Sequence, residues 1–299
     1  MNLKATCSNI KSLKIQGATN VAMSSVEALA YAASKSKAKN AEKFFSEIEA
    51  AKKMLVATRA TEPMMRNFLN YFTGRLQGLD NIKELKAEAK NAAKDVLLLK
   101  KAAKECLAKI GAGLVENNSI VYTHCHSSSV TAILKEAAKT KKFEVYNTET
   151  RPHFQGRITA EELAKAKIPV THFVDSAARF ALKKADIMMI GADAITPTGI
   201  YNKIGSGLIA ELAKKHDVPV YSCSVAWKFD PASIFGHEEA IEERNPKEVW
   251  EKPPKGVKIS NHAFEKVNAE LVAAIISELG IYNLGSFIQE TKKKYPWMF

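Results

Sequence analysis

Four short stretches between residues 147 and 229 carry many of the side chains that could do chemistry in this chain. An apolar run ends in Asp193, and Asn202 and Lys203 follow it shortly before a helical pattern. This order places a carboxylate, an amide, an ammonium group and free backbone N–H groups around one crevice. Such a set of groups would fit a phosphorylated small molecule.

A cysteine between a predicted strand and a predicted helix is the next candidate. Cys125 stands between His124 and His126 in the run VYTHCHSSSV. Backbone N–H groups at a helix start, or nearby positive charge, would lower the pKa of this thiol and favour the thiolate. The alternative is a small buried residue that only packs. The other three cysteines lack comparable neighbours and are interpreted as packing residues: Cys7, Cys106 and Cys223.

Asp193 and the pair Asn202–Lys203 each allow two interpretations. A carboxylate at the end of an apolar strand is costly to bury unless it is paired or in use, and burial would make it a general acid. Otherwise Asp193 caps the following turn. Gly205 and Gly207 would let a phosphate approach the backbone beside the point charge of Lys203. Otherwise this segment is an ordinary capped helix start.

Weaker candidates flank these groups. Arg151, Gln155 and Arg157 lie in the stiff sequence TETRPHFQGR, where an arginine either grips a phosphate or forms a surface pair. Lys228 faces the same choice. The turn at 16–18 either presents N–H groups to an anion or only starts a helix.

The elements that position these residues fall into two patterns. Residues 21 to about 110 repeat apolar positions at helical spacing, with Asn40 as an N-cap. A long helix is expected from near Asp80 to Gly111 or Gly113.

After residue 113, β-rich apolar runs alternate with helical segments. Strands are expected at 119–124, 143–147, 169–174, 186–191 and 219–224, and helices near 128–139, 159–166, 175–184 and 204–216. A proline-rich surface connection at 242–259 precedes a final helix expected at 268–280. We therefore predict an α/β protein with a helical N-terminal domain (1–115). A Rossmann-like domain (116–299) follows, with a doubly wound, mostly parallel sheet.

Composition excludes several classes of protein. The 299 residues are 46% apolar and 25% charged, as in globular proteins. No membrane-length apolar run or signal peptide is visible, so a cytoplasmic protein without membrane contact is expected. The net charge of +12 is spread over helical segments, which favours a solvated surface and an anionic ligand over nucleic acid. No metal or hydride-cofactor pattern appears, so no cofactor is expected.

The motifs TETRPxxQGRxTAxEL, DSAAR, GADxI and NKIGS, in this order, carry a specific resemblance over essentially the whole chain. They resemble the superfamily that joins methylthioribose-1-phosphate isomerase, archaeal ribose-1,5-bisphosphate isomerase and the regulatory subunits of translation initiation factor 2B. The THCHS run around Cys125 and NHAFEKV at 261–267 look most like the archaeal isomerase branch.

The resemblance implies an aldose–ketose isomerisation of α-ribose 1,5-bisphosphate to ribulose 1,5-bisphosphate in nucleoside and AMP degradation. It implies that Cys125 removes the C2 proton and that a protonated Asp193 assists ring opening, through a cis-phosphoenolate. It also implies AMP as an activator and a homo-oligomer, either a dimer or a hexamer built as a trimer of dimers. The implied substrate contacts are Gly17, Ala18, Arg59, Ser127, Gln155, Asn202, Lys203 and Lys228.

One position departs from the family pattern. The phosphate loop of the family usually reads Arg-Gly-Ala, whereas Gln16 precedes Gly17 here. A neutral amide in place of a charged fork weakens the grip on a phosphate by about 1–3 kcal/mol unless another basic residue compensates.

Two alternatives stay open within the superfamily. One is a non-catalytic regulatory subunit that binds initiation factor 2, which need not keep both Cys125 and Asp193. The other is methylthioribose-1-phosphate isomerase, whose thioether substrate needs an apolar pocket; Lys228 and Ser127 favour a polar one.

Overall fold

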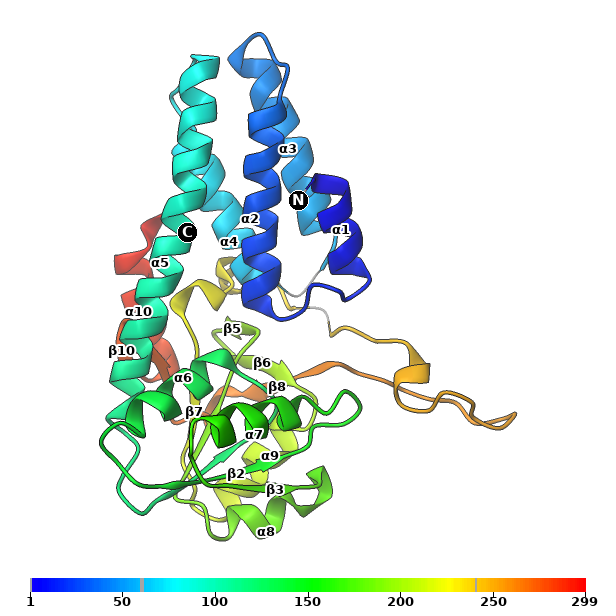
Figure 1. The fold of residues 1–299 in the computed structure, drawn as a ribbon, viewed down its shortest axis with the longest axis vertical. Helices are drawn as coiled ribbons and strands as arrows, with labels where there is room; N and C mark the ends of the chain where they lie inside the picture. The colour runs from blue at the N-terminus through cyan, green and yellow to red at the C-terminus, as the bar shows by residue number, and fades with distance from the viewer. Residues whose placement is uncertain (1, 60–61, 240) are drawn as a thin grey trace. The chain divides into compact units, whose positions relative to one another are not determined.

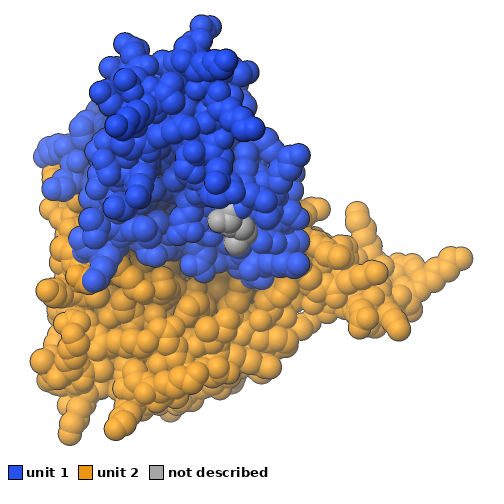
Figure 2. Space-filling model, turned by 45° about the horizontal axis from the view of Figure 1, so that its top comes forward, with its two compact units in different colours: residues 1–102, 227–239, 292–299 blue, residues 103–226, 240–291 orange. Residues whose placement is uncertain are grey.

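The computed structural model describes residues 2–59, 62–239 and 241–299 (Figure 1). The chain forms two compact units, coloured separately in Figure 2. Unit 1 comprises residues 1–102, 227–239 and 292–299, and unit 2 comprises residues 103–226 and 240–291. The predicted domain boundary near residue 115 stays a prediction.

Unit 1 is built from amphipathic helices. These are α1 (Leu3–Lys11), α2 (Ala18–Lys35), α3 (Ala41–Val56), α4 (Pro63–Arg75) and the first part of α5 (Ile82–Ala112). Helix α2 packs against α1, α3 and α4. Its inner face is buried because apolar residues such as Val26, Leu29 and Ala33 recur at helical spacing. The Asn40 side chain caps α3 by accepting a hydrogen bond from the Lys43 N–H at 2.9 Å, as predicted.

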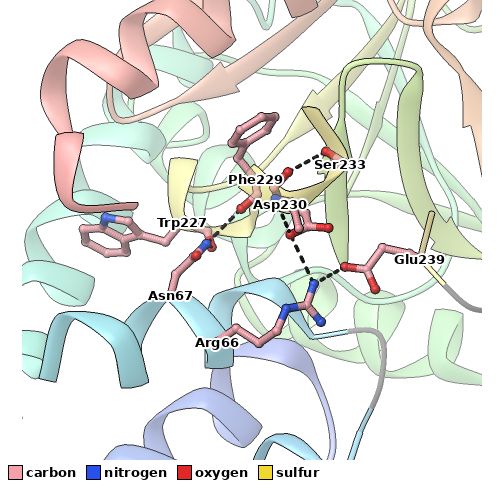
Figure 3. A network of polar contacts seen from close by, with 8 residues as sticks. Arg66, Asn67, Trp227, Phe229, Asp230, Ser233 and Glu239 are labelled. Atoms are coloured by element: carbon pink, nitrogen blue, oxygen red, sulfur yellow. Dashed lines mark hydrogen bonds and ion pairs between the residues drawn. The ribbon is translucent and has the colours of Figure 1, made fainter. Parts of the chain in front are cut away.

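Two later segments of the chain complete unit 1. The Trp227 ring packs against Phe68 and Tyr295, with ring centroids 4.9 and 5.3 Å away. The Asn67 amide on α4 donates hydrogen bonds of 2.8 Å to the carbonyl oxygens of Trp227 and Phe229 (Figure 3). A single buried amide therefore fixes the backbone of the returning segment.

Arg66, one residue earlier on α4, binds the same returning segment through charge. It forms ion pairs with Asp230, at 3.4 Å, and with Glu239 (Figure 3). Burial raises the pKa of Glu239, the Arg66 guanidinium opposes that shift, and the neighbouring Asp230 carboxylate adds to it. The two acidic side chains are almost fully buried, so this ion cluster depends on Arg66.

Unit 2 contains a seven-stranded sheet in the order β10-β9-β7-β4-β1-β2-β3. Every neighbouring pair is parallel except β9–β10. The strands are β1 (Ile120–Thr123), β2 (Glu144–Thr148), β3 (Val170–Phe173), β4 (Ile187–Ile190), β7 (Val220–Cys223), β9 (Ala274–Ser277) and β10 (Gly280–Tyr282). Strand β4 is central and wholly buried, as its IMMI sequence requires.

Helices connect these strands in two directions. The connecting helices are α6 (Ser128–Ala137), α7 (Gln155–Lys165), α8 (Ala178–Leu182) and α9 (Ser206–Lys215), whereas α10 (Leu284–Lys294) follows the last strand, β10. Helix α6 packs against α7, and α8 packs against α9 (Figure 1). The chain moves outward from β1 through β2 to β3, and in the other direction from β4 through β7 to β9. The predicted doubly wound α/β fold is therefore confirmed, and its topological switch point lies between β1 and β4.

Three strands form a second, antiparallel sheet that was not predicted. They are β5 (Ala194–Thr196), β6 (Gly199–Lys203) and β8 (Phe264–Asn268), in the order β5-β6-β8. Gly199 begins β6 with a φ of 150°, which suits the tight β5–β6 turn, and it lets β6 approach β8, because a Cβ there would lie 2.2 Å from the Val267 carbonyl oxygen. Because β6 runs to Lys203, α9 begins at Ser206.

The predicted final helix at 268–280 is wrong. These residues end β8 and then form a short 3₁₀ turn, β9 and the start of β10. Ile275 and Ile276 in β9 pair with β7 and are fully buried, a setting that favours β-branched residues in strands. The last long helix is α10 instead. No helix among the described residues is long and apolar enough to cross a membrane.

Candidate functional site

Cys125 lies in the loop that follows β1, at the switch point of the sheet. Its backbone is left-handed, with a φ of 67°, and two threonine hydroxyls hold it. The Cys125 N–H donates to Thr150 Oγ1 at 3.0 Å, and Thr159 Oγ1 donates to the Cys125 carbonyl at 2.9 Å. Thr150 follows β2 and is itself left-handed, with a φ of 63°. Hydrogen bonds between the loop after β1 and the segment after β2 therefore fix the backbone of Cys125 and so the position of its thiol.

Electrostatics around the thiol differ from the sequence prediction. Burial raises the pKa of Cys125 to about 11, although the Lys203 ammonium and the backbone N–H of His126 both lower it. The carboxylates of Asp193 and Asp175 raise it further. The prediction of a lowered pKa is therefore wrong, because desolvation of the thiolate outweighs the local positive groups.

The two histidines beside Cys125 have lowered pKa values and form hydrogen bonds that connect neighbouring segments. Burial lowers the pKa of His124, and its Nε2–H donates to the Ile204 carbonyl at 3.0 Å. Its Nδ1 then accepts from Thr148 Oγ1 at 2.7 Å. His124 thus joins β2 to the loop before α9. Burial also lowers the pKa of His126, so at neutral pH neither imidazole adds positive charge beside the thiol.

Asp193 follows β4 after Gly191 and Ala192, across the switch point from Cys125. Its N–H donates to the Tyr201 carbonyl at 2.8 Å, which turns the chain into the β5–β6 hairpin. The end of β4 also closely approaches the start of α6, where Ser127 is the N-cap. A Cβ on Gly191 would lie 2.7 Å from Ser127 Oγ. Because Gly191 has no side chain, the segment that leads to Asp193 can pack against the N-terminus of α6 at the carboxyl edge of the sheet.

Lys203 ends β6 and is buried, with an exposed fraction of only 4%. Its ammonium lies 4.9 Å from the centre of the Phe264 ring. Burial lowers its pKa, whereas the neighbouring Cys125 and Asp193 raise it. The thiol, the carboxyl and the ammonium groups therefore lie within electrostatic reach of one another.

The start of α9 is less open than the glycine pattern suggested. Glu265 Oε1 accepts a hydrogen bond from the Gly207 N–H at 2.8 Å. The Asn202 amide donates to Ser206 Oγ at 3.1 Å. At Gly207 the capped-helix interpretation therefore holds, and Glu265 occupies an N–H group that we expected to be open to a phosphate.

Gln155 is the first residue of α7, after the loop that leaves β2, and is half-buried. Two arginines flank it on the surface. Arg157 pairs with Glu149 at 3.1 Å, and Arg151 donates to the Val249 carbonyl at 3.0 Å. Arg157 therefore forms the surface pair that was the alternative to phosphate binding, whereas Arg151 is exposed and bonds a backbone carbonyl instead.

The remaining sequence candidates belong to unit 1. Gly17 has a φ of 81° and precedes α2, which begins at Ala18. The exposed Gln16 side chain donates to the Leu13 carbonyl at 2.6 Å. Arg59 is buried and pairs with Glu62 at 3.6 Å. Lys228 is half-buried. Five candidates thus lie in unit 1, whereas unit 2 holds six: Cys125, Ser127, Gln155, Asp193, Asn202 and Lys203.

Sequence reasoning missed two charged groups near Cys125 and Lys203. Asp175, in the DSAAR motif, accepts hydrogen bonds of 2.8 Å from the Thr150 and Arg151 N–H groups and so anchors the loop after β2. Arg244 lies in the segment that we interpreted as a surface connection, yet its side chain is only 7% exposed. Across residues 2–59, 62–239 and 241–299, no group of three or more His, Cys, Asp or Glu side chains could hold a metal ion.

Comparison with known proteins places this geometry in a family. The model of the initiation factor 2 subunit family matches residues 14–284. The chain belongs to this family. It is 37% identical to the ribose 1,5-bisphosphate isomerase of Pyrococcus furiosus, over 97% of this chain and 93% of that protein.

Two further relatives show the breadth of the family. The methylthioribose-1-phosphate isomerase of Thermosipho africanus is 31% identical, over 91% of this chain and 84% of that protein. The crystal structure of the Pyrococcus horikoshii translation initiation factor eIF-2B superposes with a TM-score of 0.80 at 25% identity. That match covers 94% of this chain and 96% of the other.

Proposed function

We propose that this protein is an isomerase that converts α-ribose 1,5-bisphosphate to ribulose 1,5-bisphosphate. One observation carries the proposal: Cys125, Asp193 and Lys203 lie within electrostatic reach of one another at the switch point of the sheet. A relative named for this reaction is 37% identical over nearly the whole chain. A thiolate can act as a general base, a carboxyl group as a general acid, and an ammonium group can stabilise negative charge, so this set can carry out a proton transfer on a phosphorylated sugar.

In the proposed reaction, the Cys125 thiolate removes the proton from C2 of the sugar. Asp193, in its protonated form, gives its proton to the ring oxygen as the bond between C1 and that oxygen breaks. The electron pair of the C2–H bond becomes the C1–C2 double bond of a cis-phosphoenolate. The Asp193 carboxylate takes the proton of the C2 hydroxyl, which leaves the C2 oxygen of this intermediate as the enolate. The Cys125 thiol then returns its proton to C1 as the C2 carbonyl forms, so both groups regain their starting protonation and the atoms and charge balance.

The charged neighbours suit these roles. Lys203 opposes the effect of burial on Cys125, and would therefore stabilise the thiolate in the reacting state. As a buried cation it would also bind a phosphate or a sugar oxygen. Asn202 and Ser127 would supply neutral hydrogen bonds at the same edge.

The test is to supply purified protein with ribose 1,5-bisphosphate, with and without AMP, and to follow ribulose 1,5-bisphosphate by phosphorus NMR. Cys125→Ser and Asp193→Asn should each abolish turnover and leave substrate binding largely intact. Cys106→Ser is the matched control, because this exposed cysteine has no part in the proposed reaction. Full turnover by Cys125→Ser would overturn the proposed mechanism. Faster turnover with AMP, and a dimer or hexamer by light scattering, would support the proposed activator and assembly.

Methylthioribose 1-phosphate is a second candidate substrate, because the T. africanus relative is named for it. The same assay with both sugars decides between them. The buried cation Lys203 serves one phosphate in either case, so specificity depends on how the other end of the sugar is held. Inactivity towards both sugars would favour a non-catalytic role like that implied by the name of the P. horikoshii relative.

A further inference from the structure

Arg244 is a buried guanidinium that the proposed reaction does not yet use. Only 7% of its side chain is exposed, and its Nη1 has no hydrogen-bond partner among the described residues. Its Nε lies 3.4 Å from Glu242 Oε1, close enough for an ion pair but without the geometry of a hydrogen bond. A buried donor without an acceptor is costly, so this arrangement points to an acceptor supplied by a ligand.

The backbone around Arg244 is well fixed. The Arg244 N–H donates to the Asn261 carbonyl at 2.8 Å, and the Ala263 N–H donates to the Glu242 carbonyl at 2.9 Å. These bonds hold residues 242–244 against residues 261–263, which immediately precede β8. The guanidinium is therefore held in place by main-chain pairing, and not only by its contact with Glu242.

Arg244 also lies near the cation that the proposed site already contains. The Phe264 ring centre is 6.0 Å from the Arg244 guanidinium carbon and 4.9 Å from the Lys203 ammonium. Lys203 and Phe264 face each other in the β6–β8 register. Two buried cations beside one ring repel each other, and a shared anion would turn that repulsion into attraction.

We propose that Arg244 and Lys203 together bind one phosphate group, with Arg244 Nη1 donating to one oxygen and Lys203 to another. A tetrahedral oxyanion has enough acceptor oxygens for both groups, and the planar arginine fork matches phosphate geometry. This inference rests on the proposed function for its substrate, a sugar bisphosphate.

The test measures inorganic phosphate binding by isothermal titration calorimetry, and the KM for ribose 1,5-bisphosphate, in Arg244→Gln and Arg244→Lys. Arg244→Gln should weaken phosphate binding by about tenfold or more and raise KM, because a charged hydrogen bond is lost. The phosphate affinity and the KM of Arg244→Lys should lie between those of the parent protein and those of Arg244→Gln. Lysine keeps the positive charge but loses the planar, two-donor geometry of the guanidinium. Circular dichroism checks folding, and Arg244→Lys decides if Arg244→Gln does not fold.

Two control variants separate binding from structure. Arg157→Gln is a matched control, because Arg157, like Arg244, lies beside one glutamate and one phenylalanine ring but is exposed. This variant should leave phosphate affinity unchanged. Glu242→Gln removes the acidic partner of Arg244 and should maintain or strengthen phosphate binding. Equal loss of phosphate affinity in Glu242→Gln and Arg244→Gln would mean that Arg244 only pairs with Glu242, and would overturn the inference.

The outcomes also distinguish this inference from the proposed function. Phosphate binding that depends on Arg244, in a protein without isomerase activity, would support the anion site and reject the reaction. Isomerase activity with parental KM and phosphate affinity in both Arg244 variants would support the reaction and reject the role of Arg244. A parent protein that binds no phosphate would reject it as well.

Discussion

The Cys125 thiol should react with alkylating reagents slowly at neutral pH, and tenfold faster with each pH unit up to pH 10. Burial raises its pKa to about 11 from an ordinary value of 9.0. Only the thiolate reacts, so the reactive fraction at pH 7 is about 1 in 10,000, against about 1 in 100 for an unshifted thiol. In the proposed reaction the same thiolate is the base, so kcat/KM for the free enzyme should also rise with pH.

Two neighbouring charges give predictions of opposite sign. Besides the dominant effect of burial, Lys203 lowers the pKa of Cys125 and Asp193 raises it. Lys203→Met should therefore slow alkylation at pH 8, and Asp193→Asn should speed it. A variant that only loosened the packing would speed alkylation in either case, so the pair of variants separates charge from access.

The assay is treatment with iodoacetamide between pH 6.5 and 9.5, followed by mass spectrometry of the peptide that contains Cys125. Cys106 is exposed and reports the reagent's reactivity in the same sample, whereas Cys7 and Cys223 are buried. Circular dichroism at each pH confirms that the protein stays folded.

Two results would refute this reasoning. A rate that levels off below pH 9 would mean that the thiol ionises readily despite its burial. Rates that change in the same direction in Lys203→Met and Asp193→Asn would mean that access, and not charge, controls the reaction.

Three further predictions concern single contacts. Gly191→Ala should reduce kcat about 10–100-fold in the isomerase assay, because the new methyl group would lie 2.7 Å from Ser127 Oγ and shift the site edge; an unchanged kcat would contradict this. Asn40→Ala should lower the free energy of unfolding in urea by about 1 kcal/mol, since the cap on the Lys43 N–H is lost. Asn67→Ala should cost about 1–3 kcal/mol in the same measurement, because two buried carbonyl oxygens lose their donor; a loss no larger than that of Asn40→Ala would argue against this.

The parallel strands could be predicted from sequence because their burial is encoded locally. A strand covered on both faces must be apolar throughout, and turn-forming residues mark its ends. The run at 186–191, for example, corresponds to β4 (Ile187–Ile190). Local sequence failed at 268–280, where we expected a helix. There the decisive interaction is pairing with β7, which lies about fifty residues earlier in the chain.

The site could be predicted in outline for the same reason. Cys125 and Asp193 each follow an apolar run, and the carboxyl ends of parallel strands meet at one edge. Their energetics could not be predicted in this way, because the pKa of Cys125 depends on burial by segments distant in sequence. Arg244 was missed because its local sequence is polar and proline-rich. Backbone pairing of the 242–244 segment with Asn261 and Ala263, about twenty residues later, takes it into the interior.

The backbone at Cys125 argues that the position of its sulfur matters. A left-handed conformation costs a residue other than glycine about 1–2 kcal/mol, and both Cys125 and Thr150 adopt it. Hydrogen bonds offset that cost: Thr150 and Thr159 bind the Cys125 backbone, and Asp175 binds the Thr150 N–H. A cysteine that only filled space would not need two strained loops to hold it. Strain that neighbouring contacts enforce is typical of functional sites, and here it fixes a thiol beside a carboxyl and an ammonium group.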